Sequence, residues 1–293
     1  MLTIKNFRSE AMLLLTALIW GFAFVAQRVG MEHMGPFTFN GLRFALGSLT
    51  LIPVLWWRHK KNDQSKTVIA RKSVIAGTLA GAILFLGASL QQIGLMTTTA
   101  GKAGFITGFY VILVPVLGLF WGQHAGRSTW VGAIVALIGL FYLSVRRDLY
   151  MVQGDIFMIL GAFCWAGHVQ IIDYFSARVG AVRLAFMQFV TTSVLSFFVG
   201  WLIEDWNSMA WGGAWIAVLF AGIFSVGIAY TLQVIAQKDA PPARAAIILS
   251  LESVFAVLGG WLFLREMLSP RGIFGAVLML TGTWISLSSR KQT

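Results

Sequence analysis

The sequence predicts an all-α polytopic membrane protein, with ten transmembrane helices in two inverted five-helix repeats. Ten apolar stretches of bilayer-spanning length fill the 293 residues, and the last five follow the pattern of the first five. Hydrophobic residues make up 58% of the chain and charged residues 11%. Because soluble domains carry roughly 25% charged residues, this chain has too little polar surface to coat a globule in water.

Each predicted span is close to the ~20 residues that cross ~30 Å of hydrocarbon. The approximate bounds are Glu10–Arg28, Phe37–Trp57, Ser73–Ile93, Ala100–Trp121, Thr129–Val145, Gly154–Ile172, Ala181–Ile203, Ala214–Val234, Ala243–Leu264 and Pro270–Ser288. The longest link, 58–72, is a short basic loop, so no extramembrane domain is expected. The first apolar run lacks a small-residue cleavage site and is expected to be retained as a helix.

The two halves of the chain, 1–148 and 149–293, are expected to be the repeats. The matched residues are Trp20 with Trp165 and Arg43 with Gln188 at an offset of 145, Gln92 with Gln233 and Gly118 with Gly259 at 141, and, after a two-residue gap, Gly132 with Gly275 and Gly139 with Gly282. A unit with an odd number of spans emerges upside down when it is duplicated in tandem. A pseudo-two-fold axis in the membrane plane is therefore expected, as in many secondary transporters.

The distribution of basic residues predicts the orientation in the membrane. Of the 22 lysines and arginines, 15 fall in segments on the side of the amino terminus and 6 on the other, while Arg43 lies within a span. This asymmetry favours a multi-pass protein of the cell (inner) membrane with both termini cytoplasmic. The net charge of +11 is spread beside membrane spans without an aromatic-interleaved pattern, which disfavours nucleic-acid binding. The one cysteine, Cys164, excludes a disulfide within the chain.

The polar and aromatic residues at membrane depth are the candidate substrate-binding residues, since a charge there costs at least ~2.5–3.5 kcal/mol and persists only with a partner or a wet cavity. They recur at three- and four-residue spacing, which places them on shared helix faces. The candidates are Trp20, Phe24 and Gln27 on the first span, Asn40 and Arg43 on the second, Tyr110 on the fourth, Trp165 and His168 on the sixth, Gln188 on the seventh, Tyr230 and Gln233 on the eighth, and Glu252 on the ninth.

The roles of these residues stay open between functional and structural interpretations. Glu252 either carries a coupling proton or ties neighbouring helices together, for example by pairing with Arg43. Arg43 either binds a substrate carboxylate through two donors or only anchors its helix. His168 either titrates near neutrality or packs as a structural residue. Trp20 and Trp165 either stack on a flat substrate or fill space between helices.

Three segments carry a resemblance to a known family. Ser250–Ser286 resembles the closing two helices of the EamA-type transporters of the drug/metabolite transporter superfamily, and Ala17–Gly21 with Pro36–Phe44 resembles their opening two. The resemblance extends over the whole chain. It implies ten helices in two inverted repeats and the export or exchange of small metabolites, such as amino acids, through a central cavity.

The resulting hypothesis is a secondary transporter that works by alternating access, with a small-molecule substrate and the lipid bilayer as its partners. Proton coupling and a monomeric or homodimeric state remain open. One alternative is a proton-driven exporter of organic cations, and an alternative of another class is an intramembrane lipid-modifying enzyme. The chain has no P-loop, no HExxH and no Cys/His cluster of metal spacing, so no enzyme activity, cofactor or metal is expected.

Overall fold

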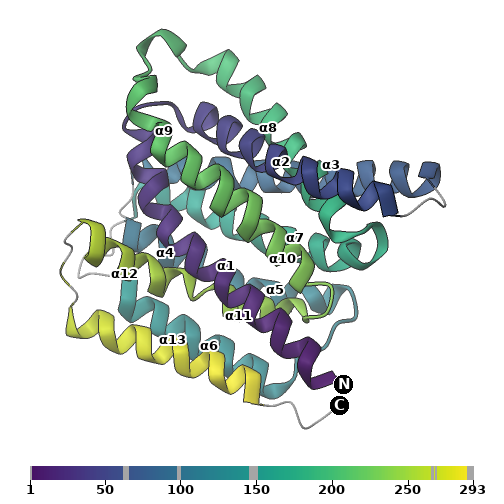
Figure 1. Cartoon of the computed structure of the whole chain (residues 1–293). Coiled ribbons are helices and arrows are strands. Elements are labelled where there is room, and N and C mark those ends of the chain that lie inside the picture. The colour runs from purple at the N-terminus through teal and green to yellow at the C-terminus, as the bar shows by residue number, and fades with distance from the viewer. Residues whose placement is uncertain are drawn as a thin grey trace.

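The computed structural model describes residues 2–61, 66–97, 100–144, 151–264, 267 and 269–288. Helices are the only regular secondary structure in these residues. The first part of α1 and the last part of α13 lie at the same end of the bundle (Figure 1). We call this the Pro242 end, because α11 begins there, and the opposite end the Pro36 end, because α2 begins there.

Eight helical segments in the described residues are long and apolar enough to cross a membrane, and Gly104–Phe120 is a shorter apolar one. The elements are α1 Leu2–Met31, α2 Pro36–Lys61, α3 Lys66–Leu95, α4 Ala100–Thr107, α5 Tyr110–Phe120, α6 Arg127–Ser144, α7 Gln153–Val179, α8 Ala181–Ile203, η1 Trp206–Ser208, α9 Trp211–Leu219, η2 Phe220–Tyr230, α10 Thr231–Ala236, α11 Pro242–Leu249, α12 Glu252–Leu264 and α13 Pro270–Ser288. This confirms a multi-pass membrane protein.

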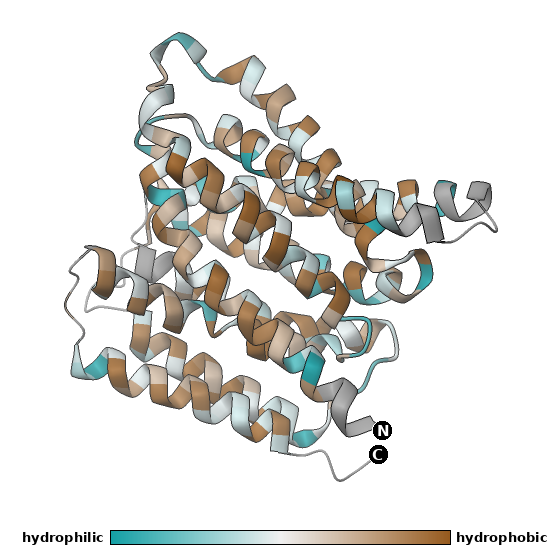
Figure 2. Cartoon of the chain, in the orientation of Figure 1, coloured by the Kyte–Doolittle hydropathy of each residue, from teal (hydrophilic) through white to brown (hydrophobic). Residues whose placement is uncertain are grey.

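Large apolar side chains cover the outside of the bundle. Ile216 is 85% exposed, Trp201 is 70% exposed and Trp284 is 69% exposed. Hydrophobic residues, drawn in brown, occur along all of the long helices (Figure 2). Soluble monomers rarely expose contiguous apolar surface of this extent, so these side chains contact lipid.

The helices pack as pairs that join the two halves of the chain. α3 lies against α7 and α8, α2 against α8 and η2, and α1 against η2 and α12. α6 and α13 pack along each other at one side of the bundle (Figure 1). In each of these pairs, one helix comes from residues 1–148 and the other from residues 149–293. Neither part of the chain therefore forms a hydrophobic core by itself.

Glycines allow the backbones of α6 and α13 to touch. A Cβ on Gly132 would meet the carbonyl oxygen of Gly282, and one on Gly139 would meet that of Gly275. Lipid tails are as apolar as the helices, so helices associate in a membrane through close packing of small residues and not through a hydrophobic drive. The same role holds on α3, where Gly81 lies against the Gln188 carbonyl of α8.

Three predicted spans differ from the structure. The fourth, Ala100–Trp121, and the ninth, Ala243–Leu264, are each broken into two helices, at residues 108–109 and 250–251. The eighth, Ala214–Val234, contains a long π-helical stretch, η2. Apolar periodicity could not reveal these departures, because the residues on both sides of each one remain apolar enough to continue a span.

We expect Gly275→Val to destabilise the protein. The added side chain would collide with the backbones of Gly139 and Leu143, which cannot move without separating α6 from α13. Overpacking of this kind costs roughly 1–3 kcal/mol. Thermal unfolding in detergent should show a clear fall in Tm. Gly212→Val on the open surface of α9 is the matched control, since nothing lies within 4 Å of its Cβ position. Equal Tm values for the two variants would contradict the close contact.

Candidate functional site

The two broken helices have the same local hydrogen-bond pattern. In the first break, Phe109 N donates to Ile106 O at 3.2 Å and Val111 N to Gly108 O at 3.0 Å. In the second, the equivalent bonds run from Leu251 N to Ile248 O at 3.1 Å and from Ser253 N to Ser250 O at 3.1 Å. Every donor and acceptor of the second set lies 142 residues after its counterpart in the first. Each helix thus tightens into a single turn with i to i+3 bonds and then resumes.

The residues that flank these breaks line one internal cavity. It encloses about 530 Å³ of empty space, part of it open to solvent. Thr107 and Tyr110 flank the first break, and Leu249 and Glu252 flank the second. The remaining lining residues are Trp20, Phe24, Gln27, Arg43, Gln91, Trp165, Val169, Ser225, Tyr230 and Gln233. Irregular backbone at membrane depth is tolerated where it is buried in protein or lines a cavity, and this cavity meets that condition.

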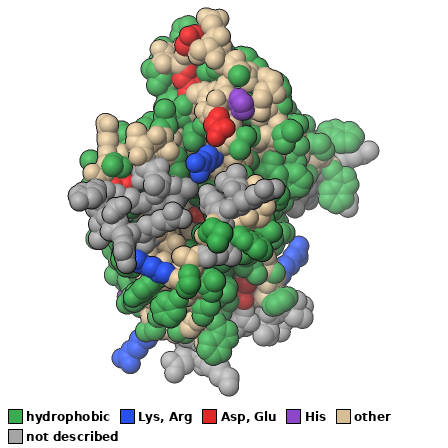
Figure 3. Space-filling view, turned by 90° about the vertical axis from the view of Figure 1, so that its left-hand side faces the viewer, with side chains coloured by type: hydrophobic (Ala, Val, Ile, Leu, Met, Phe, Trp, Pro, Cys, Tyr) green, Lys and Arg blue, Asp and Glu red, His purple; other side chains and the backbone are tan. Residues whose placement is uncertain are grey.

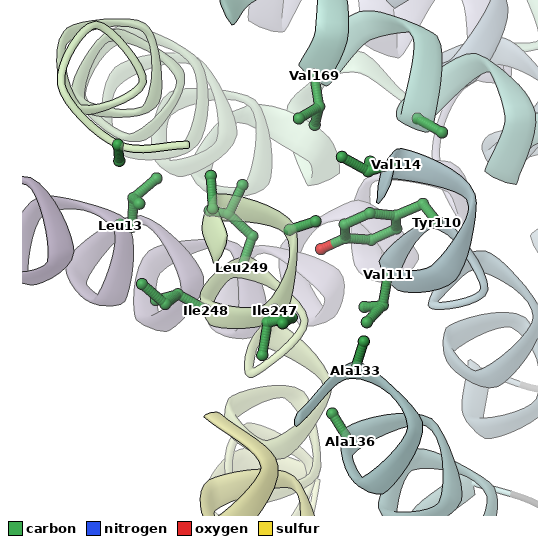
Figure 4. Packing of buried hydrophobic residues seen from close by; sticks show 14 of the residues in the cluster. Leu13, Tyr110, Val111, Val114, Ala133, Ala136, Val169, Ile247, Ile248 and Leu249 are labelled. Atoms are coloured by element: carbon green, nitrogen blue, oxygen red, sulfur yellow. The ribbon is translucent and has the colours of Figure 1, made fainter. Parts of the chain in front are cut away.

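Apolar packing closes the cavity toward the Pro242 end. Leu13, Val114 and Ile248 are buried there, in one cluster with Val169 and Leu249, which line the cavity (Figure 4). The ring of Tyr110 lies among them, and its hydroxyl points toward the α11 segment (Figure 4). On the opposite side, Gln27 near the end of α1 and Gln91 near the end of α3 extend the cavity toward the Pro36 end.

A cluster of aromatic rings forms one wall. The ring centroids of Trp20 and Tyr230 are 4.5 Å apart, and Trp165 lies stacked against Tyr230 at 6.4 Å. Trp20 Nε1 donates to the Ser225 carbonyl oxygen at 3.2 Å, within the π-helical stretch η2. π-Helical turns leave such carbonyls away from ideal α-helical pairing and recur at functional sites. The wall is therefore held by a hydrogen bond as well as by packing.

Among the described residues that line the cavity, Arg43 carries the positive charge. Its side chain is 2% exposed, and Nε donates to Asn40 Oδ1 at 2.9 Å. Its guanidinium lies 5.0 Å from the Phe44 ring centroid and 5.8 Å from that of Phe39, within the range of a cation–π contact. Asn40 and the two rings thus fix the direction of the guanidinium plane, while its end reaches the cavity.

Among the described residues that line the cavity, Glu252 is the acidic one, and it is the first residue of α12. In the described part of the chain, Arg43 and Glu252 do not form an ion pair with each other or with another residue. Of the interpretations left open for Glu252, a direct pairing with Arg43 is therefore not seen in the described residues. Both side chains line the cavity. The spacing of residues along a helix predicts which face a side chain is on, but not how far it lies from a side chain on another helix.

Three predicted site residues lie behind the cavity wall. Nine of the twelve candidates line the cavity; Asn40, His168 and Gln188 do not. His168 Nε2 and Gln188 Oε1 form a 2.9 Å hydrogen bond, and the His168 ring contacts those of Tyr230 and Trp165. These two polar side chains support the aromatic wall from outside the cavity.

The cavity also contains residues that were not among the candidates, namely Gln91, Thr107, Val169, Ser225 and Leu249. Thr107 and Leu249 could have been found from the helix breaks, since paired interruptions in corresponding spans indicate binding sites. Val169 and Leu249 are apolar and carry no signal of their own. Within the described segments, no group of three or more His, Cys, Asp or Glu side chains is arranged to hold a metal ion.

Comparison with known proteins gives a consistent family assignment. The model of the EamA-like transporter family matches residues 8–145 and again 152–288. The chain belongs to the EamA-like transporter family. A protein of Archaeoglobus fulgidus described as an uncharacterized transporter is 31% identical over 283 residues, which cover 94% of this chain and 85% of the relative.

Another relative and one solved structure are also similar to this chain. The Bacillus subtilis protein YoaV, also described as an uncharacterized transporter, is 25% identical and aligned over 92% of this EamA-like chain and 93% of its own. A solved crystal structure shares the fold with a TM-score of 0.80 over 97% of this chain and 98% of that one, at 19% sequence identity. The family confirms a multi-pass membrane transporter, as the sequence predicted.

We expect thiol reagents to distinguish the cavity from the region behind its wall. In a Cys164→Ala background, Gln233→Cys should react with a small water-soluble methanethiosulfonate because Gln233 lines the cavity. Gln188→Cys should react at least about tenfold more slowly, although the exposed fractions of Gln188 and Gln233 are both close to zero. Mass spectrometry of the labelled protein in detergent measures both rates. Equal reactivity would contradict the placement of Gln188 behind the wall.

Proposed function

We propose that this protein is a secondary transporter that exports or exchanges small amphipathic metabolites, such as amino acids, by alternating access. One observation carries the proposal. Two helix breaks with the same hydrogen-bond pattern flank a cavity that contains Arg43, Glu252 and an aromatic wall. In secondary transporters, substrate sites lie near the membrane midplane at the junction of two repeats, where broken helices expose polar backbone groups.

The proposal includes ten spans in two inverted five-helix repeats, 1–148 and 149–293. The contacts between α6 and α13 support it. Gly132 meets Gly282 and Gly139 meets Gly275. Because the sequence matches Gly132 with Gly275 and Gly139 with Gly282, exchanging the halves turns the first contact into the second. A two-fold interface has this self-complementary form.

A second contact supports the same symmetry closer to the cavity. A Cβ on Gly81 of α3 would lie 2.7 Å from the Gln188 carbonyl oxygen of α8. A Cβ on Gly222, 141 residues later, would lie 3.2 Å from the Arg43 carbonyl oxygen of α2. Gln188 is the predicted repeat partner of Arg43. The contact of α3 with α8 thus resembles that of η2 with α2, which supports a two-fold axis between α2 and α8.

The charges of the cavity support a zwitterionic substrate. Arg43 presents a guanidinium held by Asn40, which suits a planar carboxylate. Glu252 presents a carboxylate without an ion-pair partner in the described residues, which suits an ammonium group. Trp20, Trp165 and Tyr230 offer flat apolar surface to the rest of the molecule. An amino acid carries a carboxylate for Arg43, an ammonium group for Glu252 and a side chain that can contact the aromatic rings.

The mechanism follows from the asymmetric closure of the cavity. In this conformation the cavity extends toward the Pro36 end, while apolar side chains close it toward the Pro242 end. We propose that exchange of the two repeats' conformations opens the Pro242 end, which the distribution of basic residues assigns to the cytoplasm. The bound molecule is then exposed to one compartment at a time.

A flux assay over a panel of substrates tests the proposal. Proteoliposomes with the wild-type protein should take up labelled L-phenylalanine or L-leucine at least about tenfold faster than empty liposomes. Arg43→Gln should abolish most of that uptake, because a buried, bidentate carboxylate contact is worth roughly 1.5–3 kcal/mol. Val131→Ala, which changes an exposed side chain on α6, serves as the control variant. Transport of a cationic dye such as ethidium, with no amino acid transported, would favour the organic-cation exporter instead.

Glu252 is proposed to couple a proton to transport. We expect Glu252→Gln to remove the acceleration of uptake by an imposed pH gradient, because an amide cannot gain or lose the proton. Exchange of substrate without a gradient should continue at a measurable rate. Coupling that is unchanged in Glu252→Gln would leave Glu252 with only its substrate-facing charge and reject the proton role.

A further inference from the structure

A second hollow opens at the Pro36 end, outside the cavity. It encloses about 720 Å³ of empty space, part of it open to solvent. The α1–α2 turn, the residue after α3 and the segment that follows α8 form its walls. Figure 3 looks onto this end of the molecule and shows carboxylates, a histidine and, just below them, a basic side chain in its upper half. We call this hollow the outer groove.

The apolar lining of the outer groove consists largely of methionine. Met31, Met34, Met96 and Met209 come from three separate segments of the chain and share this surface. Methionine is unbranched and polarizable, so it adapts to ligands of different shape and is common at promiscuous binding surfaces. The methionine side chains of the groove can thus adjust their rotamers to apolar ligands of different shape.

The polar lining of the outer groove is acidic. Glu32, Glu204 and Asp205 line it, and no lysine or arginine is among the described residues that do so. Glu204 already accepts three hydrogen bonds from the start of α2, and Asp205 accepts one from Asn207 N at 3.0 Å. Glu32 is exposed, and no hydrogen bond or ion pair of its carboxylate is seen in the described residues. It is therefore the carboxylate best placed to meet a cation.

The walls of the outer groove are tied to each other. Glu204, just past α8, bonds the backbone nitrogens of Phe37 and Thr38 at 2.7 and 2.9 Å. Ala210 N donates to the His33 carbonyl oxygen at 2.9 Å, and the His33 ring lies against Gly213. These bonds hold the α1–α2 turn against the segment after α8. The groove is preformed, which lowers the entropic cost of binding.

The outer groove continues the cavity along α1. Trp20, Phe24, Gln27 and Met31 follow one another at four-, three- and four-residue spacing, so they share one helix face. The first three line the cavity and the fourth lines the groove. Between them, Gln91 Nε2 donates to Gln27 Oε1 at 3.5 Å, a long hydrogen bond that joins α1 to α3.

We propose that the outer groove is a second binding site, which holds a small amphipathic molecule by its ammonium end before that molecule passes the Gln27–Gln91 pair into the cavity. Glu32 attracts the ammonium group, and the methionines contact the apolar part. The two glutamines form the boundary, because their single long bond is easily replaced by bonds to a passing solute. This inference rests on the proposed transport function for its role, though not for the binding itself.

The first experiment measures the charge preference of the groove without any transport. In a Cys164→Ala background, the Met31→Cys thiol should react roughly three- to tenfold faster with a cationic than with an anionic methanethiosulfonate, after correction for their intrinsic rates. Adding Glu32→Gln should remove most of this preference. Adding Asp239→Asn, which changes an exposed acid at the Pro242 end, should leave it unchanged. No preference, or a preference insensitive to Glu32→Gln, would overturn the proposal.

The second experiment measures uptake of labelled L-phenylalanine. Glu32→Gln and Met31→Ala should each raise KM roughly three- to tenfold with little change in the maximal rate, while Asp239→Asn should match the wild type. A bifunctional thiol reagent across Gln27→Cys and Gln91→Cys should block uptake. Normal wild-type uptake with KM unchanged in both groove variants would reject the second site and leave the transport function standing. Failure of the wild type to transport any amino acid in the panel would instead reject the proposed substrate class, while the reagent rates still decide whether the groove binds cations.

Discussion

The structure depends on one constraint, which is that every backbone polar group at membrane depth must find a partner inside the protein. Lipid offers no hydrogen bond, so a helix can be interrupted there only where protein or water replaces it. Both interruptions, at residues 108–109 and 250–251, keep their amides paired, the first residue of each through an i to i+4 bond and the second through an i to i+3 bond, and both face a shared cavity. The cavity and the breaks therefore require each other, and the charged side chains of Arg43 and Glu252 occupy the only kind of surroundings in which they are tolerated.

The glycine contacts show how the rest of the bundle supports that centre. α6 and α13 approach until their backbones touch, and α3 and η2 press their glycines against α8 and α2. Such contacts are rigid because backbone atoms have nowhere to move. Glutamine and aromatic residues line the cavity, and methionines line the outer groove. The proposed alternating access would require such close contacts to hold the bundle together while its two ends open in turn.

Much of the architecture could be predicted from the sequence, because apolar length and residue spacing report how a helix meets lipid and protein. Trp20, Phe24 and Gln27 were placed on one face of α1, and all three line the cavity. Arg43 and Glu252 were also placed inward, but whether they pair with each other was not predictable, since spacing along one helix contains no information on the distance to another. His168 and Gln188 show the same limit, because a polar residue that faces inward can lie behind an aromatic wall as easily as beside a cavity.

The helix breaks were the largest omission, although Gly108 and Ser250 stand at them. Their meaning emerges only when the two halves are aligned, because one interruption is ordinary and two at matching positions are not. Hydrogen–deuterium exchange in lipid nanodiscs tests this centre most directly. The amides of 108–111 and 250–253 should exchange faster than those of the flanking helices, and a transported amino acid should slow both sets together. Slow exchange at both breaks, with no response to any substrate, would contradict a wet cavity between them.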